Sequence, residues 1–330
     1  LTDIPLFIDP ERTRFRRAEF PDMATANSWR VRQTMNGAFA KARQGGKHLN
    51  YRHAFHAGNF ADVHKHALLA RLVESFKRKD KAFRVYDTHA GIGVYDLASE
   101  AALRTGEAKA GIDLFMASDA RSHPLLAAYA DAVETVDSRP GHRAYPGSPM
   151  LIRRLLRPQD RLSAYELHPE DARTLADNFA GDVQVKAIHL DGWLALGAHL
   201  PPKEKRGMVL IDPPFEEAGE FRRIVEHLQK AVRRWAGGTF AVWYPIKRKA
   251  DVAQFHEALS DSLIPNILAL DFLREDFGAE DRLVGSGLVV INPPYGFAQE
   301  AQTIMEVLLP VLSTSSTAHC GINVLAAERI

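Results

Sequence analysis

The stretch Asp212-Pro213-Pro214-Phe215 combines residue types that can do chemistry on a flat, nitrogen-bearing ring. It follows Gly207–Ile211, a short apolar run that predicts a buried strand, and the prolines must end that strand because proline lacks an N–H and has a fixed φ. The result is a rigid turn at the carboxyl end of a strand, where open α/β sheets bind ligands. Its carboxylate and carbonyls can accept hydrogen bonds from an exocyclic amine, and its aromatic ring can stack on a heterocycle. The alternative is structural: the acid caps a turn and the ring fills core.

A second chemically suggestive turn follows a predicted strand at 83–87. That strand ends in Asp87 and leads into a turn that contains Gly91 and Gly93. An acid at a strand end, followed by a glycine turn, is typical of the nucleoside-binding corner of a Rossmann-like sheet. The turn is neither Gly-x-Gly-x-x-Gly nor a phosphate-binding loop, since no Gly-Lys-Ser/Thr follows. It therefore suits a cationic, phosphate-free cofactor, and S-adenosylmethionine (SAM) is one.

Two more acids stand at or just after predicted strand ends. Glu166 ends the strand 162–166, where its carboxylate can bind ribose hydroxyls. Asp191 and Gly192 follow the strand 183–188 and are placed to meet an adenine edge. Together with the first two turns, these residues predict one ligand site along the carboxyl edge of a sheet.

The spacing of the acids predicts how the chain is organised. Glu166 lies 79 residues after Asp87, whereas a dinucleotide site would place its second acid about 20 residues on. The residues between are mostly Ala- and Leu-rich, so we expect an inserted helical subdomain over about 95–147. Apolar residues at helical spacing predict a helix over 60–79. The seven predicted strands cover 83–87, 162–166, 183–188, 207–212, 239–244, 266–272 and 287–291.

Composition limits the class of protein. The chain has 330 residues, of which 46% are hydrophobic and 25% charged, as in globular proteins with a sizeable core. Its single cysteine, Cys320, excludes an intrachain disulfide. No apolar run approaches the roughly 20 residues that span a bilayer, and no basic-then-apolar leader opens the chain, so we expect a cytoplasmic protein. The net charge of +1 means that nucleic-acid binding would depend on local patches.

Residues 1–50 differ from the rest of the chain because they show no helical or strand periodicity. Residues 1–52 contain ten Lys and Arg against five Asp and Glu. They are either a basic arm that contacts RNA phosphates or a poorly packed leader that is not native, and we favour the second interpretation. We expect the folded domain to cover 51–330.

The motifs of this domain, read together, resemble the bacterial ribosomal large-subunit methyltransferase J family over about 51–325. The motifs that carry the resemblance include Tyr51-Arg52-His53, Phe55-His56-Ala57-Gly58-Asn59, Lys65-His66, Tyr145-Pro146-Gly147-Ser148-Pro149, Glu166-Leu167-His168-Pro169, Asp191-Gly192 and Asp212-Pro213-Pro214. The resemblance implies an α/β fold: a Rossmann-like SAM-dependent methyltransferase with a seven-stranded mixed sheet and an inserted helical subdomain. It also implies methyl transfer to the exocyclic N6 of a specific adenine in 23S rRNA.

The resemblance assigns roles to individual residues. The cofactor-lining residues are His66, His89, Gly91, Ser148, Glu166, Asp191, Gly192 and Asp212. Asp212 is also catalytic, with Pro213 and Phe215, while Tyr51, Lys65 and Phe215 meet the substrate RNA. One departure is that Phe215 stands where the family usually has Tyr, so a stacking ring is kept and a hydroxyl is lost. We expect no metal and a monomer.

Other interpretations compete with this one. Asn292-Pro293-Pro294-Tyr295 is a second candidate signature, but we expect the strand before it to run antiparallel to its neighbours and to end away from the cofactor edge. A metallohydrolase would use histidine ligands, for which His53, His56, His64, His66 and His89 are candidates. A DNA adenine-N6 methyltransferase and a non-catalytic RNA-binding protein are the remaining alternatives.

Overall fold

The computed structural model describes residues 56–136, 143–278 and 281–328. The expected basic leader over 1–50 and the predicted RNA contact Tyr51 lie outside these ranges, as does His53. None of the helices in the described ranges combines the length and apolar character that crossing a membrane requires.

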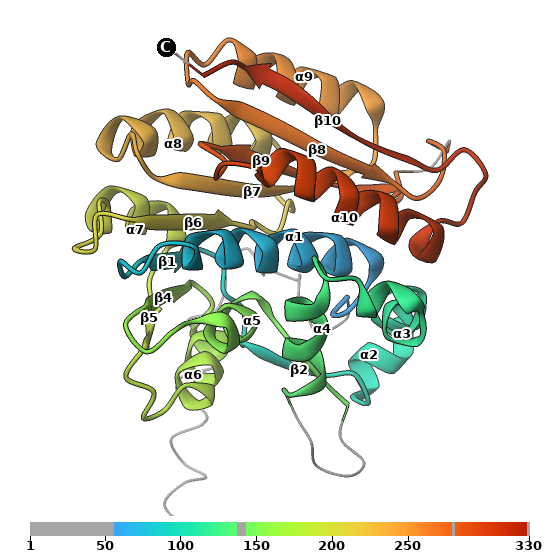
Figure 1. The fold of residues 1–330 in the computed structure, drawn as a ribbon, viewed down its shortest axis with the longest axis horizontal. Helices are drawn as coiled ribbons and strands as arrows, with labels where there is room; N and C mark the ends of the chain where they lie inside the picture. Colours follow the sequence, from blue (N-terminus) through green and yellow to red (C-terminus); the bar gives the residue numbers. More distant parts are fainter. Residues whose placement is uncertain (1–55, 137–142, 279–280, 329–330) are drawn as a thin grey trace, which may run out of the picture. The chain divides into compact units, whose positions relative to one another are not determined.

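The centre of the fold is an eight-stranded sheet in the order β10-β8-β9-β7-β6-β1-β4-β5 (Figure 1). Its strands are β1 (Arg84–Asp87), β4 (Arg161–Glu166), β5 (Val185–His189), β6 (Gly207–Ile211), β7 (Thr239–Ile246), β8 (Ile267–Leu273), β9 (Gly285–Ile291) and β10 (His319–Ala326). The run from β5 to β7 is parallel, and β9 is antiparallel to both of its neighbours. This confirms a mixed α/β sheet, with all seven predicted strands present.

The eighth strand, β10, is missing from the sequence prediction. It pairs antiparallel with β8 at one edge of the sheet and is only partly buried. An edge strand with one solvated side lacks the continuous apolar run that marks the central strands, which explains why its sequence gives little signal.

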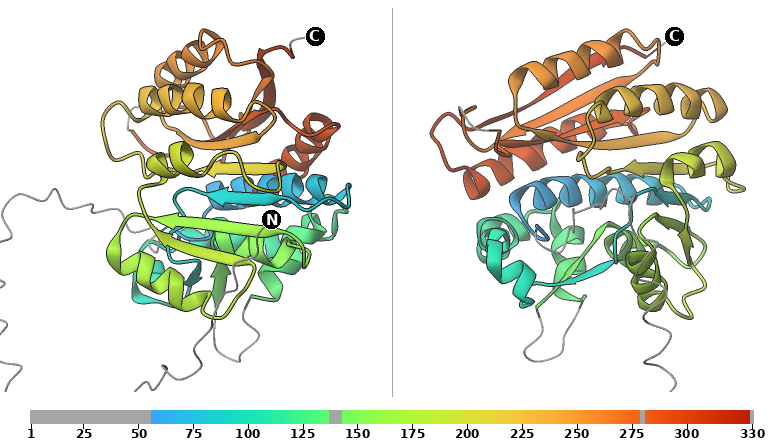
Figure 2. Two further views of the ribbon diagram at one scale, coloured as in Figure 1. Left: turned by 90° about the vertical axis from the view of Figure 1, so that its left-hand side faces the viewer. Right: turned by 180° about the vertical axis from the view of Figure 1, so that it is seen from behind.

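Helices cover both faces of the sheet. On one face lie α1 (Phe60–Lys77), α5 (Ser148–Leu155), α6 (Pro169–Asn178) and α10 (Phe297–Leu312), which share a single apolar cluster. On the other face lie α7 (Gly192–His199), α8 (Glu220–Arg234) and α9 (Lys249–Ser260), which form a second cluster (Figure 2, view from behind). The sheet therefore separates two cores, as in doubly wound α/β folds.

Between β1 and β4 the chain forms a group of short elements. They are β2 (Val94–Asp96), α2 (Glu100–Thr105), the 3₁₀ turn η2 (Glu107–Ala110), α3 (Ile112–Ala117), a second 3₁₀ turn η3 (Asp119–Ser122), α4 (Ala127–Glu134) and β3 (Ala144–Pro146). The strands β2 and β3 pair antiparallel, outside the main sheet. The Ile112 amide donates a 2.8 Å hydrogen bond to the Gly58 carbonyl, which attaches this group to the loop before α1.

Helix α1 is buried on nearly all sides. Asn59 caps it by accepting a hydrogen bond from the Asp62 amide. The helix packs against α10, α5, α4 and the sheet (Figure 1). Its polar residues His64, Lys65 and His66 are therefore buried, although polar residues beside the apolar stripe of a helix are usually exposed to solvent. Buried polar groups require partners, and these partners define the candidate site.

The contact between Gly111 and the loop before α1 generates a stability prediction. A Cβ atom at Gly111 would lie 2.3 Å from the Gly58 carbonyl oxygen, so Gly111→Ala must push the inserted elements away from α1. We expect a loss of about 1–3 kcal/mol in the free energy of unfolding, measured by urea denaturation. Gly197→Ala in α7 is the control, since nothing lies within 4 Å of its Cβ position, and its stability should not fall. Equal stability of the two variants would contradict the tight docking.

Candidate active site

The two predicted ligand-binding turns meet at one edge of the sheet. Strands β1 and β6 are parallel neighbours, and Asp87 stands opposite Leu210 in their register. The Thr88 amide and hydroxyl both donate to the Leu210 carbonyl, at 3.1 and 2.9 Å. Asp87 and Asp212 therefore emerge side by side at the carboxyl edge. This edge is also the topological switch point, because the chain continues from β1 to β4 on one side and reaches β6 on the other.

A buried ion triad fixes the Asp212 carboxylate. The Lys65 ammonium lies 2.6 Å from Asp212 Oδ2 and 2.9 Å from Asp62 Oδ1. The Lys65 side chain is 4% exposed and that of Asp212 is 13% exposed. Burial opposes the charged form of Lys65, but the carboxylates of Asp212 and Asp62 outweigh burial and hold its pKa above the usual value. Lys65 was assigned to RNA contact by resemblance; in the structure its ammonium is engaged by Asp212 and Asp62.

The Phe215 ring completes the turn. Its backbone has a φ of +54°, a left-handed conformation that is uncommon for a bulky residue and that clusters at functional sites. The half-buried ring contacts Trp243 edge-on at 5.7 Å between centroids and Phe221 at 5.2 Å. The Trp243 ring also lies 5.3 Å from the Lys65 ammonium, a cation–π distance. Trp243 thus touches both the ring and the cation that hold the turn, and sequence reasoning did not identify it.

Asp87 is a buried carboxylate with one free oxygen. The Ser148 hydroxyl donates to its Oδ2 at 2.7 Å, whereas Oδ1 has no hydrogen-bond partner within the described part of the chain. Burial raises its pKa to about 7, and the nearby Asp212 carboxylate raises it further, although Ser148 opposes both effects. An orphaned buried carboxylate oxygen is costly in the unliganded protein and indicates a place for a donor or cationic ligand. Ser148 was predicted to line the cofactor, whereas Asp87 was predicted only to mark the nucleoside-binding corner.

The remaining strand-end residues shape the turns around this carboxylate. Glu166 accepts hydrogen bonds from the Gly91 amide at 2.9 Å and the His168 amide at 2.8 Å, so it holds the glycine turn in place. Asp191 caps α7 by accepting from the Trp193 amide at 2.8 Å. Gly192 is tightly packed: a Cβ there would lie 2.1 Å from the Thr88 carbonyl oxygen. The ends of β4 and β5 therefore converge on the Thr88–Gly93 turn.

Two predicted site histidines lie at the same edge, His66 buried and His89 half-buried. His66 Nδ1 is 2.7 Å from the Tyr145 hydroxyl, and their rings stack. His89 Nδ1 is 2.8 Å from the Thr88 hydroxyl, and its ring meets Trp193 edge-on. Burial lowers the pKa of His89 to about 3, so this imidazole is neutral at physiological pH.

Not every candidate from the sequence lies at this edge. Asn292 ends β9 on the opposite side of the sheet: its amide donates to the Ala236 and Gly238 carbonyls, just before β7 begins. This confirms the direction expected for the strand before it and removes Asn292 from the site. His56 and His64 bond to Glu107 and Ser286, apart from His66. Within the described residues, no group of three His, Cys, Asp or Glu side chains is arranged to hold a metal ion.

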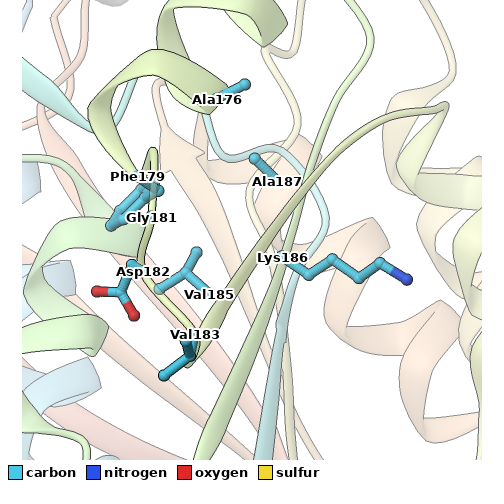
Figure 3. A pocket seen from close by; sticks show the side chains of 8 residues that line it. All are labelled: Ala176, Phe179, Gly181, Asp182, Val183, Val185, Lys186 and Ala187. Carbon is cyan, nitrogen blue, oxygen red and sulfur yellow. The ribbon is translucent and has the colours of Figure 1, made fainter. Parts of the chain in front are cut away.

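A shallow pocket lies elsewhere, along the edge strand β5 (Figure 3). Its walls come from the end of α6 and from β5 and include Phe179, Val183, Val185 and Lys186. The Lys186 side chain extends away from Asp182, which is paired with Arg153. None of the predicted site residues lines this pocket, so it is separate from the carboxyl-edge site.

Comparison with known proteins agrees with this geometry. A family model described as "Ribosomal RNA large subunit methyltransferase D, RlmJ" matches residues 80–324. The chain is 37% identical to ribosomal RNA large subunit methyltransferase J of Escherichia coli K12, over 85% of this chain and 100% of that protein. It is 36% identical to the Haemophilus influenzae protein of the same name, with the same coverage. This chain belongs to the ribosomal RNA large subunit methyltransferase J family.

Membership of the methyltransferase J family confirms the resemblance read from the motifs. A crystal structure of a Legionella pneumophila protein is similar to this one with a TM-score of 0.75 and 34% identity, covering 82% of this chain and 98% of that one. The relatives align over their full length, so the carboxyl-edge site lies within the shared family domain. At 37% identity, most side chains differ between this chain and the Escherichia coli protein, so the contacts described above apply to this chain alone.

The raised pKa of Asp87 predicts how stability depends on pH. The folded protein binds the Asp87 proton more tightly than the unfolded chain, in which the pKa of Asp is near 3.8. Protonated Asp87 therefore contributes its full stabilisation of the folded state below pH 3.8, and this contribution is lost as pH rises through 7. Between pH 5 and pH 8, wild type should therefore lose about 2–3 kcal/mol relative to Asp87→Asn, which cannot ionise. Chemical denaturation of the unliganded proteins at both pH values measures this difference. Parallel pH profiles for the two proteins would show that Asp87 is not the group responsible.

Proposed function

We propose that this protein transfers a methyl group from SAM to the exocyclic N6 of a specific adenine in 23S rRNA. The observation that carries the proposal is the Lys65-anchored Asp212 carboxylate at the carboxyl end of β6, beside the orphaned Asp87 carboxylate at the end of β1. Family membership supports the same class of reaction, since the two curated relatives are ribosomal RNA large-subunit methyltransferases by name.

The residues at the carboxyl edge fit SAM chemically. SAM carries a positive sulfonium and an ammonium, and the free Asp87 oxygen offers a buried anionic acceptor for such a group. Glu166 ends β4, the neighbour of β1, and Asp191 and Gly192 follow β5, which lies beyond β4; a nucleoside would rest along these strand ends. His66, His89 and Ser148 complete the proposed binding residues, together with Gly91 and Asp212. When bound, SAM supplies an electrophilic methyl group, and the protein's residues prepare the acceptor.

Asp212 and Pro213 prepare the adenine amine. The lone pair of that nitrogen is shared with the ring, so the amine is a weak nucleophile. Hydrogen bonds from its two N–H groups to the Asp212 carboxylate and the Pro213 carbonyl localise the lone pair on nitrogen. The carboxylate also stabilises the positive charge that develops on the amine, which is electrostatic catalysis by a group fixed in advance.

Lys65 orients Asp212 without cancelling its charge. An ammonium beside the catalytic carboxylate would by itself oppose a developing positive charge. Asp62 contributes a second carboxylate to the same ammonium, so the triad keeps a net charge of −1. In a buried setting that excess charge acts at short range on the substrate amine. Lys65 is therefore a positioning group for catalysis in this proposal, in place of the direct RNA contact expected from the sequence.

Phe215 and a basic segment would hold the RNA. A target base must leave its stack to reach the turn, and the Phe215 ring can return about 1–3 kcal/mol by stacking on it. Strand β7 ends beside β6 and continues into Lys247, Arg248 and Lys249, which are all exposed. These cations lie at the catalytic edge and fit the phosphates that flank the flipped nucleotide. Arg248 is itself paired with Asp251, so Lys247 and Lys249 carry the proposed contact. The other candidate cations Arg153 and Arg157 are engaged by Asp182 and Asp160.

Substitution of Asp212 tests the proposed chemistry. Asp212→Asn keeps the shape of the side chain but removes its charge, so we expect kcat to fall by at least about 10²-fold while SAM binding persists. Methyl incorporation into 23S rRNA, with mass mapping of N6-methyladenosine, measures the reaction, and calorimetry measures SAM binding. Asp177→Asn, the same change at an exposed position of α6, is the control and should leave kcat unchanged. Near-native turnover by Asp212→Asn would refute the assignment.

The same assay separates the alternatives. A DNA methyltransferase would prefer DNA of the same sequence, and a non-catalytic RNA-binding protein would bind RNA but not SAM. Wild-type protein should methylate the RNA and leave the matching DNA unmodified. Preferential modification of DNA would replace the proposed substrate.

Removal of the cations after β7 tests the RNA surface. The double variant Lys247→Ala/Lys249→Ala should bind RNA more weakly, and the slope of log affinity against log salt should fall by about 1–2, since each phosphate contact contributes somewhat less than one. Lys230→Ala/Arg233→Ala is the matched control, because it removes two exposed cations from the carboxyl end of α8, near the opposite edge. Fluorescence anisotropy at several salt concentrations measures both. An equal effect of the two double variants would argue against a localised surface.

A further inference from the structure

Three buried side chains form a hydrogen-bonded row between the inserted elements and α1. The Tyr129 hydroxyl in α4 lies 3.1 Å from the Tyr145 hydroxyl in β3, and that hydroxyl lies 2.7 Å from His66 Nδ1 in α1. Tyr129 and Tyr145 are 0% and 1% exposed, and His66 is 1% exposed. The reaction proposed above uses only His66 from this row.

Burial determines the direction of the hydrogen bonds. Within the described residues, the Tyr129 hydroxyl has Tyr145 as its only hydrogen-bond partner, so its proton must point there or remain unsatisfied. Tyr145 then accepts from Tyr129, and its own proton can go only to His66 Nδ1. Burial raises the pKa of both tyrosines far above the ordinary value, so both stay protonated donors. A ring nitrogen that accepts must be unprotonated, and the neutral imidazole then carries its proton on Nε2.

We propose that Tyr129 and Tyr145 are positioning residues that hold His66 in the Nε2–H tautomer, so that His66 presents a hydrogen-bond donor to SAM. This inference rests on the proposed function, in which His66 lines the SAM site. The strongest hydrogen-bond acceptor in SAM is its carboxylate. An imidazole N–H can donate to this carboxylate, whereas an unprotonated ring nitrogen would repel it. The row also gives the inserted elements a role in the site, since α4 supplies the first donor and β3 the second.

Neighbouring contacts place Tyr145 close to the site. Three residues further along the chain, Ser148 donates to Asp87, and the Gly147 amide donates to the Gly93 carbonyl in the glycine turn at 2.9 Å. The segment that holds Tyr145 is therefore fastened to the same turn as the proposed cofactor residues. A shift of the His66 ring would therefore reach the glycine turn and Asp87 through the segment Tyr145–Ser148.

The test uses two substitutions that remove only a hydroxyl. In Tyr145→Phe, His66 Nδ1 loses its donor, so both tautomers should be populated. The Kd for SAM should then rise about 2-fold, because only the Nε2–H fraction is competent to bind. In Tyr129→Phe, Tyr145 can still donate to His66 but is no longer forced to, so the rise should be smaller. Calorimetry gives the SAM affinity, and ¹H–¹⁵N long-range NMR spectra give the tautomer of His66, assigned with His66→Gln.

Tyr165→Phe is the matched control. Tyr165 also bonds to a histidine, with its hydroxyl 2.8 Å from His199 Nδ1 and stacked rings, but it belongs to the core on the other face of the sheet. Its loss should leave both the SAM affinity and the His66 tautomer unchanged. A loss of SAM affinity equal to that of Tyr145→Phe would mean that a general structural effect explains both, and the proposal would fail.

The tautomer is measured on the unliganded protein, so it is decided separately from the proposed function. A single Nε2–H tautomer in wild type and a mixture in Tyr145→Phe support the row. An Nδ1–H tautomer in wild type, or an unchanged tautomer and SAM affinity in Tyr145→Phe, overturns it. Failure of wild type to bind SAM at all would instead refute the proposed function, whatever the tautomer.

Discussion

The buried ammonium of Lys65 is the constraint on which the site depends. A charge in the protein interior must be paired, and removal of one partner of a buried pair typically costs about 3–5 kcal/mol. Lys65 therefore fixes the distance between α1 and the turn after β6, because its ammonium bonds to Asp62 on its own helix and to Asp212 on the turn. The two prolines stiffen the turn from within, and the ion pair places it from outside. The left-handed backbone of Phe215 persists because both restraints act on the same few residues.

One helical turn of α1 distributes three polar side chains to three parts of the fold. Successive helical residues are rotated by about 100°, so neighbours in sequence point in different directions. His64 reaches Ser286 in β9, whose hydroxyl also accepts from the Trp243 indole, while Lys65 reaches Asp212 and His66 reaches Tyr145. The helix thus connects the sheet, the turn after β6 and the inserted elements. Two further contacts hold it, between His56 and Glu107 just before its start and between Arg71, in its second half, and Glu300 on α10.

The charge balance of the carboxyl edge links stability to ligand binding. Asp62, Asp87 and Asp212 face a single ammonium, and Asp87 keeps one oxygen without a partner in the described structure. Burial, and to a smaller extent the neighbouring Asp212 carboxylate, raises the pKa of Asp87, so ionised Asp87 destabilises the protein without a ligand. A cationic ligand would relieve it. Selection for binding would then favour a site that is strained when empty, which is a common compromise between stability and activity.

Local sequence patterns predict the strands and the acids at their ends, because apolar runs and prolines act over a few residues. Parallel pairing then brings Asp87 and Asp212 together without further information. The burial of Lys65 and His66 could not be predicted this way, since it depends on partners far along the chain, Asp212 for Lys65 and Tyr145 for His66. The roles of single residues came from family resemblance rather than from periodicity. Asn292-Pro293-Pro294-Tyr295 shows why motif chemistry alone is insufficient. Like Asp212-Pro213-Pro214-Phe215, it offers a side-chain oxygen acceptor, two prolines and an aromatic ring, but its strand runs the other way and the Asn292 side chain bonds at the amino end of β7. Strand direction decides which of two similar turns can meet the cofactor edge.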